Sequence, residues 1–165
     1  MPSSEEMEAM SDPETVSSDI NKKKLTLALA ESCTGGIISS IITGIPGASD
    51  FFLGAVVTYS NKSKTDLLKI DSAILEKYGA VSYQTAEAMA KGAKELFGSD
   101  ITVAVTGIAG PSGGTPEKPV GLVFIAIDFD NETKVIRNVF EGSRNDIRSE
   151  AARTAVGMIL DIMER

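Results

Sequence analysis

Apolar positions recur along the chain with two different spacings, and the two spacings alternate. Five short runs are rich in β-branched and other apolar residues, which is typical of strands. They cover residues 25–30, 54–59, 101–105, 120–129 and 134–140. We predict a strand for each run, with the one at 54–59 buried. The last two should form an antiparallel hairpin, because Asp130 and Asn131 between them favour a tight turn.

Between these runs, apolar residues recur three and four positions apart, which predicts amphipathic helices. The predicted helices cover residues 13–24, 36–44, 60–68, 71–79, 82–97 and 145–165. Asp12 followed by Pro13 is a typical helix start. Strands that alternate with helices predict an α/β fold, with a mixed, mostly parallel sheet and helices on both faces.

Length and composition restrict the class of protein. A chain of 165 residues with 42% hydrophobic residues predicts a single domain over 1–165 with a sizeable core. Residues 1–12 are acidic and rich in Met and Ser, so we expect them to be a loosely held extension. The net charge of −7 argues against nucleic-acid binding, which needs a basic face. No apolar run approaches the length of a membrane span and no signal peptide opens the chain, so we expect a cytoplasmic protein.

Two residue counts restrict the chemistry further. The chain has no histidine and one cysteine, which excludes Ser-His-Asp and Cys-His catalysis and every zinc site that needs histidine. We see no tight acidic cluster, so we expect no metal and no cofactor, although a carboxylate–metal hydrolase stays as a weaker alternative. A base in such a chain must be Lys, Tyr, Asp or Glu.

The first glycine-rich loop, AESCTGG at residues 30–36, follows a predicted strand and opens a predicted helix. Ser32 and Thr34 offer hydroxyl groups, and Gly35 and Gly36 allow close approach of the backbone, so the loop could bind an anion. It could equally be a helix cap followed by glycines that serve tight packing. Cys33 could have a lowered pKa at the helix start or act as a small buried apolar residue.

The second loop, TGIAGPSGG at residues 106–114, also follows a predicted strand. It contributes Thr106, Gly107 and Gly110 as candidate binding residues, and the segment TPEKP extends it. Long ordered loops in compact domains tend to be functional, although a mobile surface loop is the alternative. Two such loops on one domain predict a pocket built from both at the strand ends.

A third group contains Ser49, Tyr59 and Lys64. Tyr59 closes a predicted strand, and Lys64 lies one helical turn after Ser60, which can bring its amine beside Tyr59. A partly desolvated lysine can lose its proton near neutral pH, so Lys64 could act as a base and Ser49 as a nucleophile. Ordinary turn chemistry at Ser49 and a solvated Lys64 are the alternative.

Arg144 and Arg148 lie one turn apart at the predicted start of the last helix. Two guanidinium groups in this register suit a phosphate or carboxylate, or they could pair with acidic residues on the surface.

The motifs together resemble those of a known family. AESCTGG, PGASDFF, VVTYSNKSK, YGAVS, TGIAGPSGGTPEKPVG and GSRNDIR occur in this order from residue 30 to residue 148. The chain is similar to the CinA C-terminal domain family, whose enzymatic members are nicotinamide-nucleotide amidases. The resemblance implies a three-layer α/β/α sandwich. It also implies deamidation of nicotinamide mononucleotide (NMN) to nicotinate mononucleotide and ammonia, a step of pyridine-nucleotide salvage, without metal or cofactor.

The same resemblance implies residue roles. The family's nucleophilic serine falls on Ser49, its tyrosine on Tyr59 and its lysine on Lys64, while Ser32, Thr106 and Arg144 fall on positions around the substrate. Many members have Gly-Ser-Ser where this chain has Gly-Ala-Ser at residues 47–49. The N-terminal domain of larger CinA proteins is not expected here, nor is its pyrophosphatase activity. A homo-oligomer is the default expectation for a small enzyme. The alternative is a non-catalytic nucleotide-binding or protein-interaction module of the competence and DNA-damage type.

Overall fold

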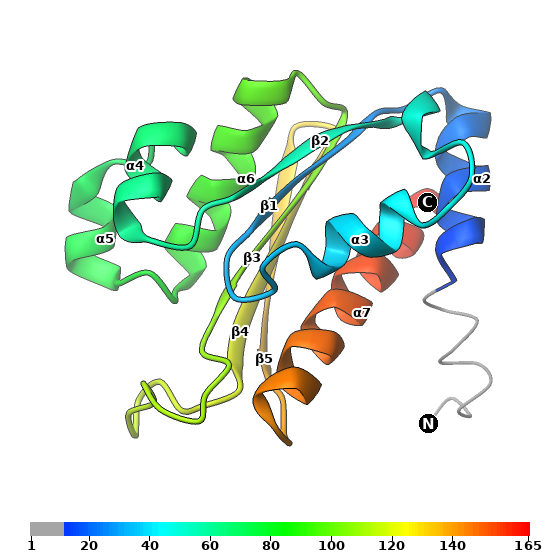
Figure 1. Cartoon of the computed structure of the whole chain (residues 1–165). Coiled ribbons are helices and arrows are strands. Elements are labelled where there is room, and N and C mark those ends of the chain that lie inside the picture. The colour runs from blue at the N-terminus through cyan, green and yellow to red at the C-terminus, as the bar shows by residue number, and fades with distance from the viewer. Residues whose placement is uncertain (1–11) are drawn as a thin grey trace.

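The computed structural model of the protein describes residues 12–165, which form one five-stranded sheet with helices on both faces (Figure 1). The strand order is β2-β1-β3-β4-β5. The strands are β1 (Leu27–Glu31), β2 (Phe52–Val57), β3 (Ile101–Gly107), β4 (Leu122–Phe129) and β5 (Glu132–Val139). β1 pairs in parallel with β2 and β3, whereas β4 runs antiparallel to both β3 and β5. The predicted α/β class, the mixed sheet and the hairpin of β4 and β5 are confirmed.

The turn of that hairpin is formed by Asp130 and Asn131, the two residues from which the turn was predicted. Asp130 and Asn131 adopt φ angles of 53° and 61°, in the left-handed region. Asp and Asn tolerate this region better than other residues with a side chain, and a two-residue turn of this kind matches the twist of the two strands.

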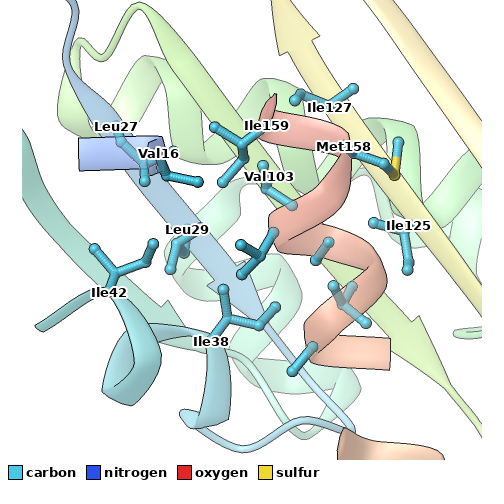
Figure 2. Close-up of a cluster of buried hydrophobic side chains, with 14 of the residues drawn as sticks. Val16, Leu27, Leu29, Ile38, Ile42, Val103, Ile125, Ile127, Met158 and Ile159 are labelled. Atoms are coloured by element: carbon cyan, nitrogen blue, oxygen red, sulfur yellow. The ribbon is translucent and has the colours of Figure 1, made fainter. Parts of the chain in front are cut away.

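Three helices cover one face of the sheet: α2 (Pro13–Lys23), α3 (Ile37–Thr43) and α7 (Arg144–Met163). Alternate side chains of the strands meet them, including Leu27, Leu29 and Val103 (Figure 2). Val16, Ile38 and Ile159 fill the space from the helices, and these residues are fully buried. This cluster is the larger of the two hydrophobic cores and anchors α3 and α7 against the sheet.

The other face carries α4 (Asn61–Leu68), α5 (Ser72–Tyr78) and α6 (Tyr83–Phe97), so the predicted three layers are present. The contact between sheet and α6 is made largely by alanines, which let the helix lie close to the strands. α4 lies equally close to α6, because a Cβ at Gly92 would overlap the carbonyl oxygen of Leu68. Small residues thus allow α4 to pack closely on α6, and α6 to pack closely on the sheet.

One strand differs from its prediction. The strand at residues 54–59 was expected to be buried, but β2 is the edge strand of the sheet and only half-buried. Its apolar side chains Leu53 and Val57 are each 47% exposed. An apolar run alone cannot distinguish a central strand from an edge strand, because the pairing partner is set by the whole topology.

Among the described residues, no helix combines the length and the apolar character that crossing a membrane requires.

Candidate functional site

Strands β1, β2 and β3 end on the same side of the sheet (Figure 1). Most of the predicted site residues, but not Ser49, lie at these strand ends. Ser32 directly follows β1, Thr58 and Tyr59 follow β2, and Thr106 is the second-last residue of β3. Parallel strands bring these ends together, since Glu31 pairs with Val57 on one side and Val105 on the other. The start of α7 and the loop at residues 108–121 reach the same edge. Ligands of open α/β sheets bind at this kind of edge.

Lys64 is the most unusual residue of this edge. Its side chain comes from the first turns of α4 and is only 1% exposed. The Nζ atom donates hydrogen bonds to Ser32 Oγ at 3.1 Å, the Thr58 carbonyl oxygen at 2.7 Å and the Tyr59 carbonyl oxygen at 3.3 Å. None of these partners carries a charge, and burial lowers the pKa of Lys64 to about 8, although the nearby Cys33 opposes this shift in part.

Ser32 and Lys64 therefore form a serine–lysine pair. Ser32 is 7% exposed, and its Oγ atom lies within hydrogen-bond distance of an amine that is partly neutral near pH 8. An amine in this state can accept the hydroxyl proton while the oxygen attacks an electrophile. The sequence pointed to both residues but gave Ser32 only a binding role, because a contact between residues 32 positions apart leaves no signal in spacing.

The structure does not bring Ser49 to Lys64 within one chain. Ser49 lies in the 3-10 turn η1 (Ala48–Asp50), before the first residue of β2, whereas Tyr59 and Lys64 follow its last residue. The strand between them spans roughly 17 Å at the usual rise per residue. Ser49 is exposed and lies at the opposite end of the strands, before the first residue of β2. Within one chain, the members of the predicted group of Ser49, Tyr59 and Lys64 therefore lie at the two ends of one strand.

Tyr59 also differs from its prediction. Lys64 Nζ contacts the carbonyl oxygen of Tyr59 rather than its hydroxyl group. The Tyr59 side chain is 60% exposed, and its hydroxyl oxygen accepts a hydrogen bond from Arg144 Nη2 at 3.0 Å. Arg144 Nη1 donates to the Gly110 carbonyl oxygen at 2.7 Å. Arg144 therefore links the β2–α4 junction to the second glycine loop.

The first glycine loop already holds an anion of the chain itself. The fully buried Glu31 carboxylate accepts hydrogen bonds from the N–H groups of Gly36, Ile38 and Ser39 and from Ser39 Oγ, at 2.5–3.2 Å. These are the groups at the N-terminus of α3 that a phosphate would use. The expected anion site at Gly35 and Gly36 is therefore occupied by Glu31, and the two glycines serve a turn with φ angles of 58° and 104°.

Arg148 lies one turn after Arg144 on α7 and binds the same loop. Its Nε atom donates to the Cys33 carbonyl oxygen at 3.0 Å, and its Nη2 atom donates to the Thr34 carbonyl oxygen at 3.2 Å. The neighbouring Cys33 thiol is buried, and this burial raises its pKa to about 11. Cys33 is thus an apolar core residue, and the lowered thiol pKa that its place at a helix start suggested is wrong.

The second glycine loop is tied down at several points. Thr106 Oγ1 donates to the Ala80 carbonyl oxygen at 2.7 Å, and Lys118 Nζ donates to the Tyr78 carbonyl oxygen at 2.6 Å. Glycine is required at Gly110, where φ is 76° and a Cβ would overlap Val120. At Gly107 a Cβ would lie 2.6 Å from Val123 Cγ2. The loop is therefore fixed in place beside the site, and the Gly110 carbonyl oxygen connects it to Arg144.

A cavity of about 220 Å³ lies next to this wall. Its lining includes the aromatic rings of Tyr78, Tyr83 and Phe124 and the cations Lys118 and Arg137. Phe124 pairs with Thr106 on one side and with Arg137 on the other. Thr106, Phe124 and Arg137 thus lie side by side on β3, β4 and β5. The cavity lies at β4 and β5, on the side of Thr106 away from Lys64.

Two buried hydroxyl groups near the serine–lysine pair lack a partner. Thr34 and Thr58 are fully buried, and their Oγ1 atoms form no hydrogen bond within residues 12–165. Buried hydroxyl groups without a partner are rare in folded proteins, so these two are available to hydrogen-bond a water or a ligand. Within the same residues, no group of three or more His, Cys, Asp or Glu side chains could hold a metal ion.

Comparison with known proteins identifies relatives over most of the chain. The family model described as the CinA C-terminal domain matches residues 10–163. A CinA-like protein of Thermotoga neapolitana is 51% identical over 137 residues, which are 83% of this chain and 33% of that protein. A CinA-like protein of Geotalea uraniireducens is 53% identical over 133 residues, 81% of this chain and 32% of that protein. The chain thus spans about one third of the length of these relatives.

Solved structures show the same fold. The competence/damage inducible protein CihA from Agrobacterium tumefaciens superimposes with a TM-score of 0.89 at 38% identity, covering 96% of each chain. The competence-damaged protein superfamily protein from Escherichia coli gives a TM-score of 0.90 at 29% identity, covering 98% of this chain and 93% of that one.

Proposed function

The chain belongs to the CinA C-terminal domain family, and we propose that it is an amidohydrolase that converts nicotinamide mononucleotide to nicotinate mononucleotide and ammonia. The observation that carries this proposal is the hydrogen bond between Lys64 Nζ and Ser32 Oγ, made by a buried amine with a pKa of about 8. Serine–lysine pairs of this kind supply a nucleophile and a base without histidine, which this chain lacks.

The reaction proceeds in two halves. Neutral Lys64 accepts the proton of the Ser32 hydroxyl while the Oγ atom attacks the carboxamide carbon. The lysine ammonium then gives this proton to the departing nitrogen, so that ammonia leaves and an ester remains on Ser32. In the second half, Lys64 accepts a proton from water, which attacks the ester carbon. The proton returns to Ser32 Oγ, and the carboxylic acid product ionises on release.

Arg144 is the anchor that we assign to the substrate phosphate. It is exposed, and its present partners, the Tyr59 hydroxyl oxygen and the Gly110 carbonyl oxygen, are neutral groups that a phosphate can replace. The N-terminus of α3 does not serve this role, because Glu31 occupies it. Binding energy from a phosphate far from the reacting amide positions that amide at Ser32.

The direct test is ammonia release from NMN, nicotinamide riboside and NAD by the wild type. We expect NMN to be the preferred substrate, because nicotinamide riboside has no phosphate for Arg144 to bind and the phosphates of NAD are not terminal. We also expect the Lys64→Met variant to lose at least about 1,000-fold in kcat, since it keeps the shape of the side chain and removes the base. Release of no ammonia from any of the three compounds by the folded wild type would refute the proposal.

A second candidate function rests on relatives from Moorella thermoacetica and Clostridium beijerinckii, each named a putative competence-damage inducible protein, of which this chain spans about one third. In this reading the protein is a non-catalytic nucleotide-binding or interaction module. Calorimetry that detects NMN binding at high protein concentration, together with no ammonia release, would favour it.

We further propose that the protein works in the cytoplasm as a homo-oligomer. Size-exclusion chromatography with light scattering tests the oligomeric state.

A further inference from the structure

The N–H groups of the loop after Ser32 divide into two sets. Those of Gly35, Gly36 and Ile37 are bound to oxygens of the loop or of Glu31, as are those of residues 38–40. The N–H groups of Cys33 and Thr34, in contrast, donate to no other residue within residues 12–165, and the Cys33 N–H contacts only its own thiol. Backbone N–H groups of buried residues are almost always paired, so two adjacent N–H groups that bond to no other residue are available to a partner outside the chain.

We infer that the N–H groups of Cys33 and Thr34 form the oxyanion hole of the site. This inference rests on the proposed function, because it assigns the donors that stabilise the tetrahedral intermediate formed on Ser32. When Oγ attacks the carboxamide carbon, the carbonyl oxygen gains negative charge, and donors already aimed at it lower the barrier. The donors belong to the two residues that directly follow the nucleophile, so they lie within reach of an oxygen bonded to the same carbon.

Arg148 is the residue that aims one of these donors. A trans peptide holds its C=O and N–H on opposite sides, and Arg148 Nε binds the Cys33 carbonyl oxygen from the α7 side. The Thr34 N–H, which belongs to the same peptide unit, therefore points away from Arg148. The Thr34 carbonyl oxygen is held by Nη2 of the same guanidinium group, so this one side chain fixes two successive peptide planes. Arg148 is thus a positioning residue, since it acts through the backbone and not on the substrate.

Glu31 has a complementary positioning role. Its carboxylate takes up the donors of α3 that would otherwise compete for an anion, and it holds the helix start next to Ser32. Only the donors of Cys33 and Thr34 are then left for the negatively charged oxygen. The sequence alone does not predict this role of Glu31, because a glutamate is expected to point outward unless its buried strand position is known.

The test replaces the backbone amide at Thr34 by an ester, using the α-hydroxy analogue of threonine, in the full chain. This change deletes one N–H and keeps the side chain. We expect a roughly 100-fold loss in kcat for NMN with KM changed by less than about threefold, because the lost interaction exists only in the transition state. The same replacement at Cys33 should give a loss of similar size.

Arg148→Lys and Arg148→Ala provide a second, independent measurement. Lysine cannot hold both carbonyl groups as a planar fork does, so we expect kcat to fall at least about tenfold, with the pH dependence still governed by a group near pH 8. Free guanidinium should restore part of the activity of Arg148→Ala. Arg153→Lys is the matched control: Arg153 lies on the same helix, pairs with Glu150 on the surface and should keep full activity.

The outcomes separate this inference from the proposed function. A wild type that releases no ammonia refutes the function itself. An active wild type whose esters at both positions retain full kcat overturns the oxyanion assignment, and a large loss for Tyr59→Phe alone would then move the role to the tyrosine hydroxyl. If the Arg148 variants fail to fold, as thermal unfolding would show, the two ester replacements decide the question.

Discussion

The buried amine of Lys64 makes a quantitative prediction about stability. Burial lowers the pKa of Lys64 from its ordinary value of 10.5 to about 8, so between these two values the folded protein binds fewer protons than the unfolded chain. The free energy of unfolding therefore rises with pH across this interval. A difference of 2.5 pKa units corresponds to about 3 kcal/mol, of which about 2.5 kcal/mol develops between pH 7 and pH 10.

The perturbation that isolates this effect is Lys64→Met, which removes the titrating group and keeps the length of the side chain. Urea unfolding of both proteins should be measured at pH 7, 8, 9 and 10, because other titrating groups cancel in the difference between the two. We expect the wild type to gain about 2.5 kcal/mol relative to Lys64→Met from pH 7 to pH 10. Parallel stability curves would refute the reasoning, since they would mean that Lys64 keeps an ordinary pKa and cannot act as a base near neutral pH.

Four further measurements test other contacts. Glu31→Gln should cost roughly 2–4 kcal/mol in urea unfolding, because an amide cannot accept all four hydrogen bonds of the carboxylate; Ser39→Ala, which removes one of them, should cost roughly 1 kcal/mol. Gly92→Ala should destabilise by roughly 1–3 kcal/mol despite the better helix propensity of alanine, because its Cβ overlaps the Leu68 carbonyl oxygen, and a more stable variant would show that α4 can move aside. The Cys33 thiol should react with a disulfide reagent at pH 8 at least about 100-fold more slowly in the folded protein than in urea, and equal rates would contradict its burial and raised pKa.

The fold was readable from local patterns, because each element carries its own signals. Asp12 accepts a hydrogen bond from the Glu14 N–H, and Ser82 accepts one from the Thr85 N–H, so the predicted starts of two helices rest on real caps. The turn at Asp130 and Asn131 needed only those two residues. The predicted burial of β2 was wrong, because its place as an edge strand depends on the order of all five strands.

The site was readable only in part. The glycine loops and Lys64 could be selected by residue type, and the structure places them at one edge of the sheet. The partner of Lys64 could not be selected, because the resemblance assigned the nucleophile to Ser49 while the fold puts Ser32 beside the amine. The role of Glu31 was equally hidden: a carboxylate that caps a helix seven residues later through a buried turn has no local signature.

The central claim is that Ser32, and not Ser49, is the nucleophile activated by Lys64. The most direct measurement compares kcat for ammonia release from NMN by Ser32→Ala and Ser49→Ala, with folding of both verified by thermal unfolding. We predict that Ser32→Ala loses at least about 1,000-fold while Ser49→Ala stays within about fivefold of the wild type. A Ser32→Ala variant that keeps its activity, with the loss falling on Ser49→Ala instead, would contradict the account.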